Sequence, residues 1–376
     1  MYLYLLIGLV MVILIYKMIF KLLYPFESRM PVFFYHDILS YFKWGVIEKD
    51  LPVKNKFYDV KIKYLDVNDI SDNVRLNIVN FLGRNYLPEL NEKYIPTLEN
   101  VFDYLTSHPG KSVISLMYEL DDIIGCISHV PNLCLMDGDR FEINYVDYLC
   151  VDNAKRGKKL AGKLIHTHYV NTRYNKIGSN YAISYFKYEG HTAPYMPIIR
   201  YNTYFYDMTY WTKEIKMTQS YYKIVRLNEE NYHYLFELFK TMKDRFKLIL
   251  MSDLLHIKHL NEKNHMFVFI LLMDDEPLNF YIFKDQYVKY NNKNSLLLTS
   301  SFKQSDNDMM LFGFYYSLTI LLKYKNYVKL LIEDVSDNDC IIKHNKYHHF
   351  HKTIHSYHFY NYSHKPFKSN NVIIVN

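Results

Sequence analysis

The two halves of this 376-residue chain show a similar order of predicted helices and strands, and this repeat is the strongest constraint on its fold. In the first half, apolar periodicity and turn residues predict two helices, three consecutive strands, a helix and a strand, over residues 71–86, 97–107, 112–119, 123–130, 142–151, 160–174 and 181–186. In the second half, they predict a strand, a helix, a hairpin, a strand, a helix and a strand, over residues 222–227, 229–240, 266–272, 278–283, 295–300, 309–323 and 328–332. No low-complexity linker separates the halves, so we expect a mixed α/β (α+β) fold in which two similar units form one continuous structure.

Composition narrows the class of protein. Hydrophobic residues make up 49% of the chain and charged residues 22%, which is typical of a packed globular protein and excludes a disordered or fibrous one. The net charge of +6 suits an acidic ligand, such as a phosphorylated cofactor, or the cytoplasmic face of a membrane, and it does not require nucleic acid as a partner. The four cysteines form no CxxC pair, which argues against disulfides and cysteine-type zinc clusters and favours a reducing compartment.

The N-terminus is strongly apolar. Residues 2–16 form an uninterrupted apolar run, and the hydrophobic character continues to about residue 24, which is the length that a helix needs to cross a bilayer. Positive charge follows the run at Lys17, Lys21 and Arg29, which predicts a single-pass anchor over residues 1–24 with the body in the cytoplasm. The sequence lacks a cleavage site for a signal peptide, whereas a monotopic or buried helix stays an alternative because lysines lie in the last turns.

The most informative local segment is a predicted strand that breaks into a basic loop and then enters a helix, at residues 149–161. Backbone N–H groups at the start of a helix attract anions, and Arg156, Lys158 and Lys159 add full positive charges. This arrangement predicts a site for a pyrophosphate. The run from Arg156 to Ala161 resembles the acyl-CoA loop of the N-acetyltransferase superfamily, although Lys159 stands where that pattern usually has a glycine.

Several colinear segments around this loop resemble the N-myristoyltransferase family (glycylpeptide N-tetradecanoyltransferases). Glu142-Ile143-Asn144-Tyr145, followed closely by Tyr148-Leu149-Cys150-Val151, is similar to the family's Glu-Ile-Asn-Phe-Leu-Cys-Val with a short insertion. The segment 156–161 matches the family's Arg-Ser-Lys-Arg-Leu/Val-Ala/Thr. The other similar segments are residues 24–32, 85–86, 125–131, 194–201, 278–283, 334–338 and 357–376.

The resemblance implies a fold of two fused acetyltransferase-like (GNAT) modules related by a pseudo-twofold axis. The expected division is an acyl-CoA-binding module over residues 25–215 and a peptide-binding module over residues 216–376. Myristoyl-CoA is the implied acyl donor, and no metal is expected. The implied cofactor-binding residues are Tyr24, Pro25, Phe26, Glu27, Tyr148, Leu149, Cys150, Val151, Arg156, Gly157, Lys158, Lys159, Leu160 and Ala161.

The resemblance also implies the catalytic groups. Backbone N–H groups of Tyr148 and Leu149 are expected to form an oxyanion hole for the thioester carbonyl. The α-carboxylate of the last residue, Asn376, is expected to take a proton from the N-terminal glycine of a peptide or protein substrate. Cys150 has no activating base near it in sequence and is interpreted as a small core residue.

Departures from the family pattern keep other functions open. The Gly-Asp-Gly-Asn loop that holds the peptide is replaced by residues 351–354, and the arm tryptophan by Glu27. The alternatives are another acyl-CoA-dependent N-acyltransferase, such as an N-acetyltransferase, and an inactive protein that binds acylated or glycine-starting partners. These departures and the AT-rich type of composition predict a divergent viral protein. We also expect a monomer, located in the host cytoplasm or at a virion membrane.

A dense histidine cluster near the C-terminus is the remaining constellation. It comprises His344, His348, His349, His351, His355 and His358. No acidic or cysteine ligand is interleaved, so we interpret these side chains as polar loop residues and predict no metal site.

Overall fold

A computed structural model describes residues 2–86, 92–177, 181–190, 193–210, 222–290, 292–345 and 347–376. Its helices are α1 (Tyr2–Leu23), α2 (Asp72–Asn85), α3 (Leu98–Thr106), α4 (Leu160–Tyr174), α5 (Tyr232–Arg245), α6 (Leu254–Glu262), α7 (Asn307–Tyr324) and α8 (Asn338–His344). The strands of its main sheet are β2 (Lys63–Asp66), β3 (Glu92–Tyr94), β4 (Val113–Glu119), β5 (Asp122–Met136), β6 (Asp139–Val151), β7 (Ser184–Glu189), β8 (Ile199–Asp207), β9 (Tyr222–Arg226), β10 (Leu248–Met251), β11 (Met266–Met273), β12 (Glu276–Tyr290), β13 (Lys293–Lys303), β14 (Tyr327–Glu333), β15 (His351–Tyr360) and β17 (Val372–Val375). A two-stranded sheet pairs β1 (Gly45–Val46) with β16 (Tyr362–Ser363).

The same unit occurs in each half of the chain. In the first half, β4, β5 and β6 form an antiparallel meander, α4 follows, and β7 pairs parallel to β6. In the second half, β11, β12 and β13 form the meander, α7 follows, and β14 pairs parallel to β13. Each meander also has a short strand at its outer edge, β2 against β4 and β9 against β11. The predicted repeat of elements is therefore confirmed.

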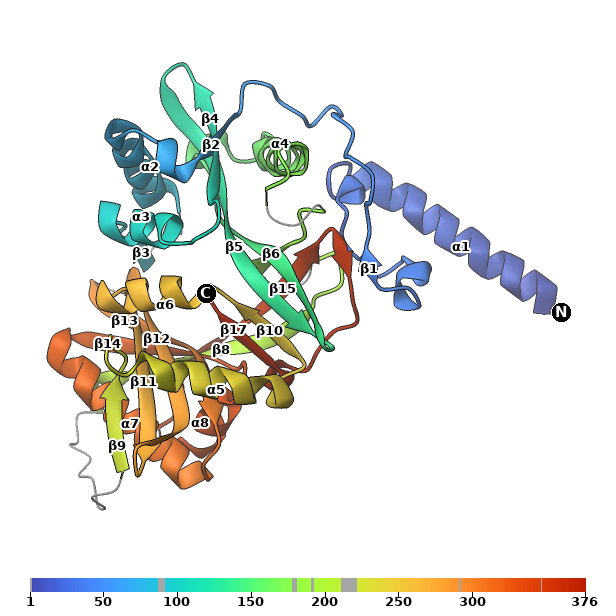
Figure 1. Ribbon diagram of the computed structural model, residues 1–376. Coiled ribbons are helices and arrows are strands. Elements are labelled where there is room, and N and C mark those ends of the chain that lie inside the picture. The colour runs from blue at the N-terminus through green and yellow to red at the C-terminus, as the bar shows by residue number, and fades with distance from the viewer. Residues whose placement is uncertain are drawn as a thin grey trace.

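Both units carry their hydrophobic residues inward. Helices α2 and α3 lie on one side of the β2–β4–β5 region and α4 lies on the other, so that both faces of these strands are covered (Figure 1). Strands such as β11 are buried on both faces, which explains why their sequences are continuous apolar runs rather than alternating ones. The mixed α/β fold is confirmed.

The last strands of the chain join the two halves into one sheet. β15 lies between β7 and β8, and β17 pairs parallel to β10, which in turn pairs antiparallel to the far end of β5. The C-terminus consequently lies in the middle of the molecule, whereas the N-terminus lies at the far end of α1 (Figure 1). The sequence patterns did not predict these pairings between the two halves, because a strand's pattern does not specify its distant partner.

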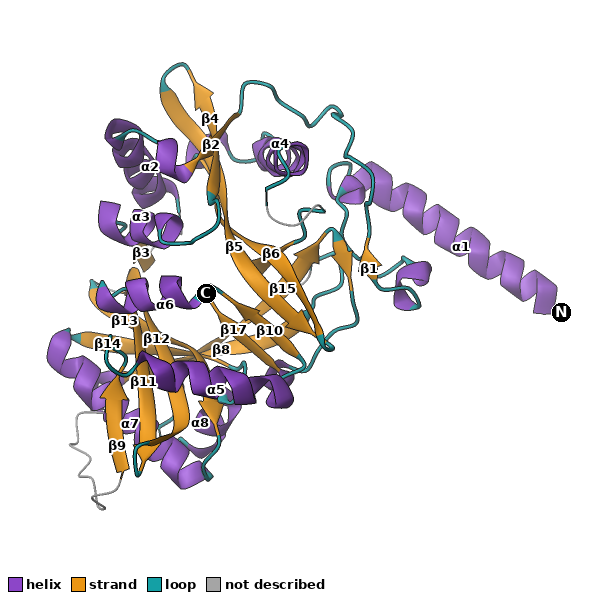
Figure 2. Ribbon diagram, in the orientation of Figure 1, coloured by secondary structure: helices purple, strands orange, loops and turns teal. Residues whose placement is uncertain are grey.

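Helix α1 projects away from the body (Figure 2). Its last turns pack against the rest of the chain: Phe20 is 5% exposed, and its ring lies 5.4 Å from that of Phe34 and 5.2 Å from that of His36. Across the described residues, no helix has the length and apolar character that a bilayer crossing requires. The predicted transmembrane anchor over residues 1–24 is therefore not supported.

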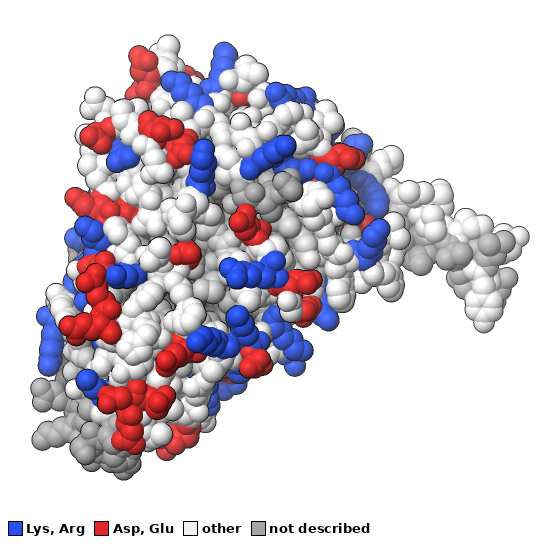
Figure 3. Space-filling model, in the orientation of Figure 1, with Lys and Arg blue, Asp and Glu red and all other residues white. Residues whose placement is uncertain are grey.

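Charged side chains are interspersed on the molecular surface. Figure 3 shows lysine and arginine side chains alternating with aspartate and glutamate over the face in view, rather than one field of a single sign. On this face, positive and negative side chains therefore lie among one another, although the whole chain has a net charge of +6.

Candidate active site

Strand β6 contains a β-bulge at the centre of the first unit. Two residues of β6, Tyr148 and Leu149, face one residue of β5, Ile127, because the pairing shifts between Cys126 and Ser128. Tyr148 has a positive φ of 51°, which is an uncommon conformation for a bulky residue and occurs mostly where the surrounding structure enforces it. The bulge lies at the two residues that the sequence predicted as oxyanion donors.

The amide of Tyr148 already has a partner. Its N–H donates to Oδ1 of Asp147 at 2.7 Å, so this predicted donor is occupied by a carboxylate of the chain itself. Burial raises the pKa of Asp147, although the Tyr148 amide and the nearby Lys284 and Lys187 act against that increase. Leu149 lies outside the paired register of β5 and β6. Sequence reasoning missed Asp147, and the available signal was an acidic residue inside the apolar run of residues 145–151.

Strands β6 and β7 separate near the bulge, and a cavity lies between them. β6 pairs with β7 only over Asn144 to Val146, and beyond that point the two strands diverge. A cavity of about 700 Å³ opens between them and extends beneath α4. It is lined by eight of the predicted cofactor-binding residues, namely Phe26, Glu27, Tyr148, Leu149, Cys150, Val151, Arg156 and Ala161. The other predicted residues, Tyr24, Pro25, Gly157, Lys158, Lys159 and Leu160, do not line it.

The basic loop approaches this cavity at the start of α4. Gly157 and Lys159 adopt positive φ angles of 80° and 60°, which turn the chain sharply between the end of β6 and α4. The first turn of α4 has no side-chain cap. Its amide groups can therefore donate hydrogen bonds to an anion. Arg156 attaches the loop to α2, because its Nη2 donates to the carbonyl of Asn85 at 2.8 Å.

The N-terminal arm closes one side of the cavity. The ring of Phe26 packs on Gly162 of α4, where an added Cβ would come within 2.9 Å of the ring, and it also meets the ring of Phe57 at 5.1 Å. A glycine at this position of α4 thus lets the arm approach the helix closely.

The end of the chain is buried and fixed. Asn376 is 8% exposed, and its side-chain Oδ1 accepts hydrogen bonds from Nδ2 of Asn132 at 2.9 Å and from the hydroxyl of Tyr185. The carbonyl of Val375 accepts from the amide of Ser252 at 2.8 Å. The ring of Tyr185 lies 4.9 Å from that of Tyr145, which lines the cavity. One aromatic contact therefore links the residue that holds the C-terminus to the cavity wall.

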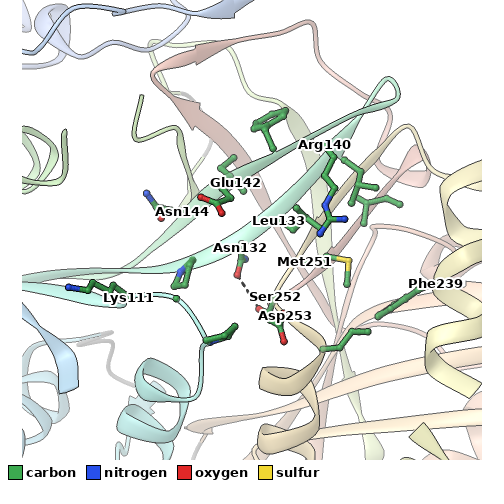
Figure 4. A pocket seen from close by; sticks show the side chains of 18 of the residues that line it. Lys111, Asn132, Leu133, Arg140, Glu142, Asn144, Phe239, Met251, Ser252 and Asp253 are labelled. Carbon is green, nitrogen blue, oxygen red and sulfur yellow. Dashed lines mark hydrogen bonds between the residues drawn. The ribbon is translucent and has the colours of Figure 1, made fainter. Parts of the chain in front are cut away.

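A second cavity, of about 880 Å³, is lined by residues of β5, β6, α5 and β10 and of the loop before β4 (Figure 4). Asn132 and Ser252 line it, and the hydroxyl of Ser252 donates to Oδ1 of Asn132 at 3.2 Å. Its other lining residues include basic Arg140 and Lys111 and acidic Asp253. The groups that fix the C-terminus thus form part of its wall.

An ion pair links the two halves of the chain. Nζ of Lys187 on β7 lies 2.9 Å from a carboxylate oxygen of Glu333 on β14, and the hydroxyl of Tyr201 donates to the same oxygen at 3.1 Å. Burial alone would lower the pKa of Lys187, but Glu333 and Glu189 raise it, so this lysine stays charged. This pair joins a strand of the first unit to a strand of the second.

Two further side chains have clear assignments. Burial raises the pKa of the Cys150 thiol to about 12, so the residue is a protonated core residue rather than a nucleophile. In the histidine cluster, His351, His355 and His358 lie in strand β15, so their interpretation as loop residues is wrong. Nδ1 of His355 lies 2.8 Å from the hydroxyl of Thr203. Among the described residues, no group of histidine, cysteine and acidic side chains has the arrangement of a metal site.

Comparisons with known proteins agree on the architecture. No model of a known protein family matches this chain. A relative from Amsacta moorei entomopoxvirus, described as "Putative glycylpeptide N-tetradecanoyltransferase", is 25% identical over 255 residues, which cover 66% of this chain and 77% of the relative. A crystal structure of Saccharomyces cerevisiae N-myristoyltransferase with bound myristoyl-CoA superimposes with a TM-score of 0.75 at 16% identity, over 92% of this chain and 94% of that one. A second structure of the yeast enzyme with myristoyl-CoA gives a TM-score of 0.72 at 16% identity, over 94% of each chain. The chain therefore has the fold of yeast N-myristoyltransferase.

Proposed function

We propose that this protein is a glycylpeptide N-tetradecanoyltransferase, which transfers a myristoyl group from myristoyl-CoA to the N-terminal glycine of target proteins. The observation that carries the proposal is the burial of Asn376, which is connected through Tyr185 to Tyr145 in the wall of the cavity of the first unit. Chain ends are usually poorly ordered, whereas here Asn132 on β5 and Tyr185 on β7 hold the side chain of Asn376 in the core.

The comparisons support the same activity. The yeast structures of matching fold contain myristoyl-CoA, and the viral relative carries the name of this enzyme. The cavity beneath α4 combines an apolar interior with a basic loop at its entrance, which suits a fatty thioester of a phosphorylated carrier.

We assign the substrates to the two units. Residues 25–215 would bind the acyl donor, because the gap between the diverging strands lies there. In the second unit, the corresponding region beyond Leu298 and Ile332 contains polar side chains and the C-terminal strand: the hydroxyl of Ser300 donates to the carbonyl of Ile374, and that of Ser301 to Oδ1 of Asn338 at 2.6 Å. Residues 216–376 would therefore serve the peptide. The repeated order of elements is consistent with two acetyltransferase-like modules related by a pseudo-twofold axis.

The proposed reaction is a direct acyl transfer. The α-carboxylate of Asn376 takes a proton from the glycine ammonium, and the free amine then attacks the thioester carbonyl carbon. The carbonyl oxygen gains negative charge, which the amide of Leu149 and, once the Asp147 side chain turns away, the amide of Tyr148 stabilise. The carbon–sulfur bond breaks, the former amine nitrogen loses its second proton, and the CoA thiolate takes up a proton in turn, so that a neutral amide and the CoA thiol remain.

A mass measurement tests the proposal. The full chain is incubated with myristoyl-CoA and a peptide that begins with glycine, and a peptide that begins with alanine serves as the control. We expect one myristoyl group on the glycine peptide and none on the control. Faster transfer from acetyl-CoA than from myristoyl-CoA would instead identify a short-chain N-acetyltransferase.

A modified C-terminus tests the proposed base. One residue added after Asn376 removes the carboxylate from its position, and we expect the rate of transfer to fall by about a hundredfold or more. Binding of myristoyl-CoA is measured in parallel, since retained binding shows that the extended chain is folded. An extended chain that binds the donor and reacts at the original rate would exclude the terminal carboxylate as the base.

We also propose that the protein acts as a monomer in the cytoplasm of a host cell, where α1 contacts a lipid surface. Val12, Met18 and Leu22 of α1 are 64%, 60% and 75% exposed, and exposed apolar side chains favour such contact. Co-sedimentation of the full chain with liposomes, compared with a chain that starts after residue 24, tests the contact. Equal sedimentation of both chains would refute it.

A further inference from the structure

The side chain of the last residue is held by a network of hydrogen bonds. Oδ1 of Asn376 accepts from Nδ2 of Asn132 at 2.9 Å and from the hydroxyl of Tyr185. Nδ2 of Asn132 also donates to the hydroxyl of Tyr185 at 2.6 Å, so these three polar groups meet at one point. Oδ1 of Asn132 accepts from the hydroxyl of Ser252 at 3.2 Å, which orients the Asn132 amide.

This network is buried, and its members come from separate segments of the sheet. Asn132, Tyr185 and Ser252 are all at most 6% exposed. Asn132 lies on β5, Tyr185 lies on β7, and Ser252 directly follows β10. Burial raises the pKa of Tyr185, so its hydroxyl keeps its proton and can donate it to Asn376. Three segments of the sheet therefore fix one side chain.

The backbone before Asn376 is held as well. Val375 is the last residue of β17, it pairs with Met251 of β10, and its carbonyl accepts from the amide of Ser252 at 2.8 Å. The nitrogen of Asn376 lies in the same peptide plane as this carbonyl, so the strand fixes it. The Cα of Asn376 thus has its nitrogen held by the strand and its side chain held by the network. At an L-residue these two groups determine the direction of the third, the α-carboxylate.

Stability alone does not account for a polar network at this place. The four residues of β17 that precede Asn376 are apolar and buried. Replacing hydrogen-bonded partners in a core by apolar groups of the same shape is close to neutral for folding, so apolar side chains would fill this position as well. A satisfied buried network does something that apolar contacts do not, because it restricts its members to one arrangement.

We infer that the side chain of Asn376 aims its α-carboxylate at the glycine ammonium, and that Asn132 and Tyr185 are the positioning residues that hold this side chain. The inference rests on the proposed function and concerns the geometry of its base. A last residue without a side-chain acceptor would still supply a carboxylate, but that carboxylate would turn about the end of β17. A general base acts only within hydrogen-bond reach of the proton that it accepts, so the transfer would slow.

The pH dependence of Asn376→Leu tests the inference, since leucine has a similar size and keeps the α-carboxylate. Transfer from myristoyl-CoA to a peptide that begins with glycine is measured for the full chain. At about pH 6.5 we expect kcat/KM for the peptide to fall by about tenfold or more, with the Kd of myristoyl-CoA unchanged. An α-amino group has a pKa of about 8, so at about pH 9 the solution supplies the free amine and the loss should shrink to about threefold or less.

Two further variants separate positioning from damage to the fold. Tyr185→Phe keeps the ring that packs on Tyr145 and removes the hydroxyl that donates to Asn376, so it should show the same pH-dependent loss, of about threefold or more. Asn279→Leu is the matched control. Asn279 is also fully buried, and its Oδ1 accepts from the amides of Gln304 and Ser305 at 2.9 and 3.2 Å, outside the network. Its kcat/KM should match that of the wild type at both pH values.

The outcomes distinguish the inference from the proposed function. A wild-type rate in an Asn376→Leu chain that binds myristoyl-CoA, or a loss by the same factor at both pH values, would overturn the inference and leave the proposed function standing. If Asn376→Leu does not bind myristoyl-CoA, Tyr185→Phe decides the matter by the same criterion. Absence of transfer by the wild type would refute the proposed function itself.

Discussion

At the scale of single residues, Asp147 governs the shape of the site. Its carboxylate holds the amide of Tyr148 in the bulge, where the backbone of Tyr148 has a positive φ. The interaction shows that the amide of Tyr148 is oriented toward a side-chain oxygen inside the bulge. A thioester oxygen that gains negative charge would compete for the same donor.

We expect Asp147→Ala to lower the free energy of unfolding by about 1–3 kcal/mol, because the buried amide of Tyr148 loses its acceptor. Asp147→Asn keeps an acceptor oxygen and should retain most of that stability. Urea denaturation of the two variants and the wild type measures the difference. Equal losses in both variants would mean that the negative charge, rather than the hydrogen bond, is what stabilises the bulge.

At the scale of elements, α4 links the arm, the loop and the cavity. The sequence predicted a helix over residues 160–174, and the structure has α4 with the same bounds. Its start faces the basic loop, Gly162 meets Phe26, and its later turns line the cavity. One helix thus contacts the arm, follows the basic loop and forms part of the cavity wall.

Gly162→Ala should weaken the binding of myristoyl-CoA by about tenfold, because the new Cβ would lie 2.9 Å from the ring of Phe26 and displace the arm from the cavity. Gly83→Ala in α2 is the matched control: its Cβ would meet Pro96 at an ordinary 3.4 Å, and alanine favours the helix. Calorimetric titration of both variants measures the effect. Unchanged affinity in Gly162→Ala would show that the arm does not need this close packing.

At the scale of the whole molecule, the core contains several neutral histidines. Burial lowers the pKa of His108, His129 and His355 to about 3 and that of His358 to about 4. In the unfolded chain these groups titrate near 6.5, so between that pH and about 3 the unfolded state binds more protons than the folded state.

We therefore expect the free energy of unfolding to fall as the pH decreases below about 6.5, with a slope that corresponds to the uptake of several protons. Denaturant midpoints measured from pH 7 to pH 4 provide the test. His355→Gln, which removes one of these groups, should make the slope shallower by about one proton. A midpoint that stays constant over this range would contradict the buried neutral state of these side chains.

The sequence by itself determined the local elements and the basic loop. The 3.6-residue apolar spacing of α2 and α4, the apolar runs of β4 and β11 and the turn between β6 and α4 depend on neighbours along the chain, so their residues are sufficient to predict them. The tertiary structure alone decided the pairing of β10 with both β5 and β17, the occupied amide of Tyr148, the contact between His168 and His129 and the burial of Asn376. These features join residues that are far apart in the chain, and their free energy depends on packing and desolvation that exist only once the whole sheet has formed.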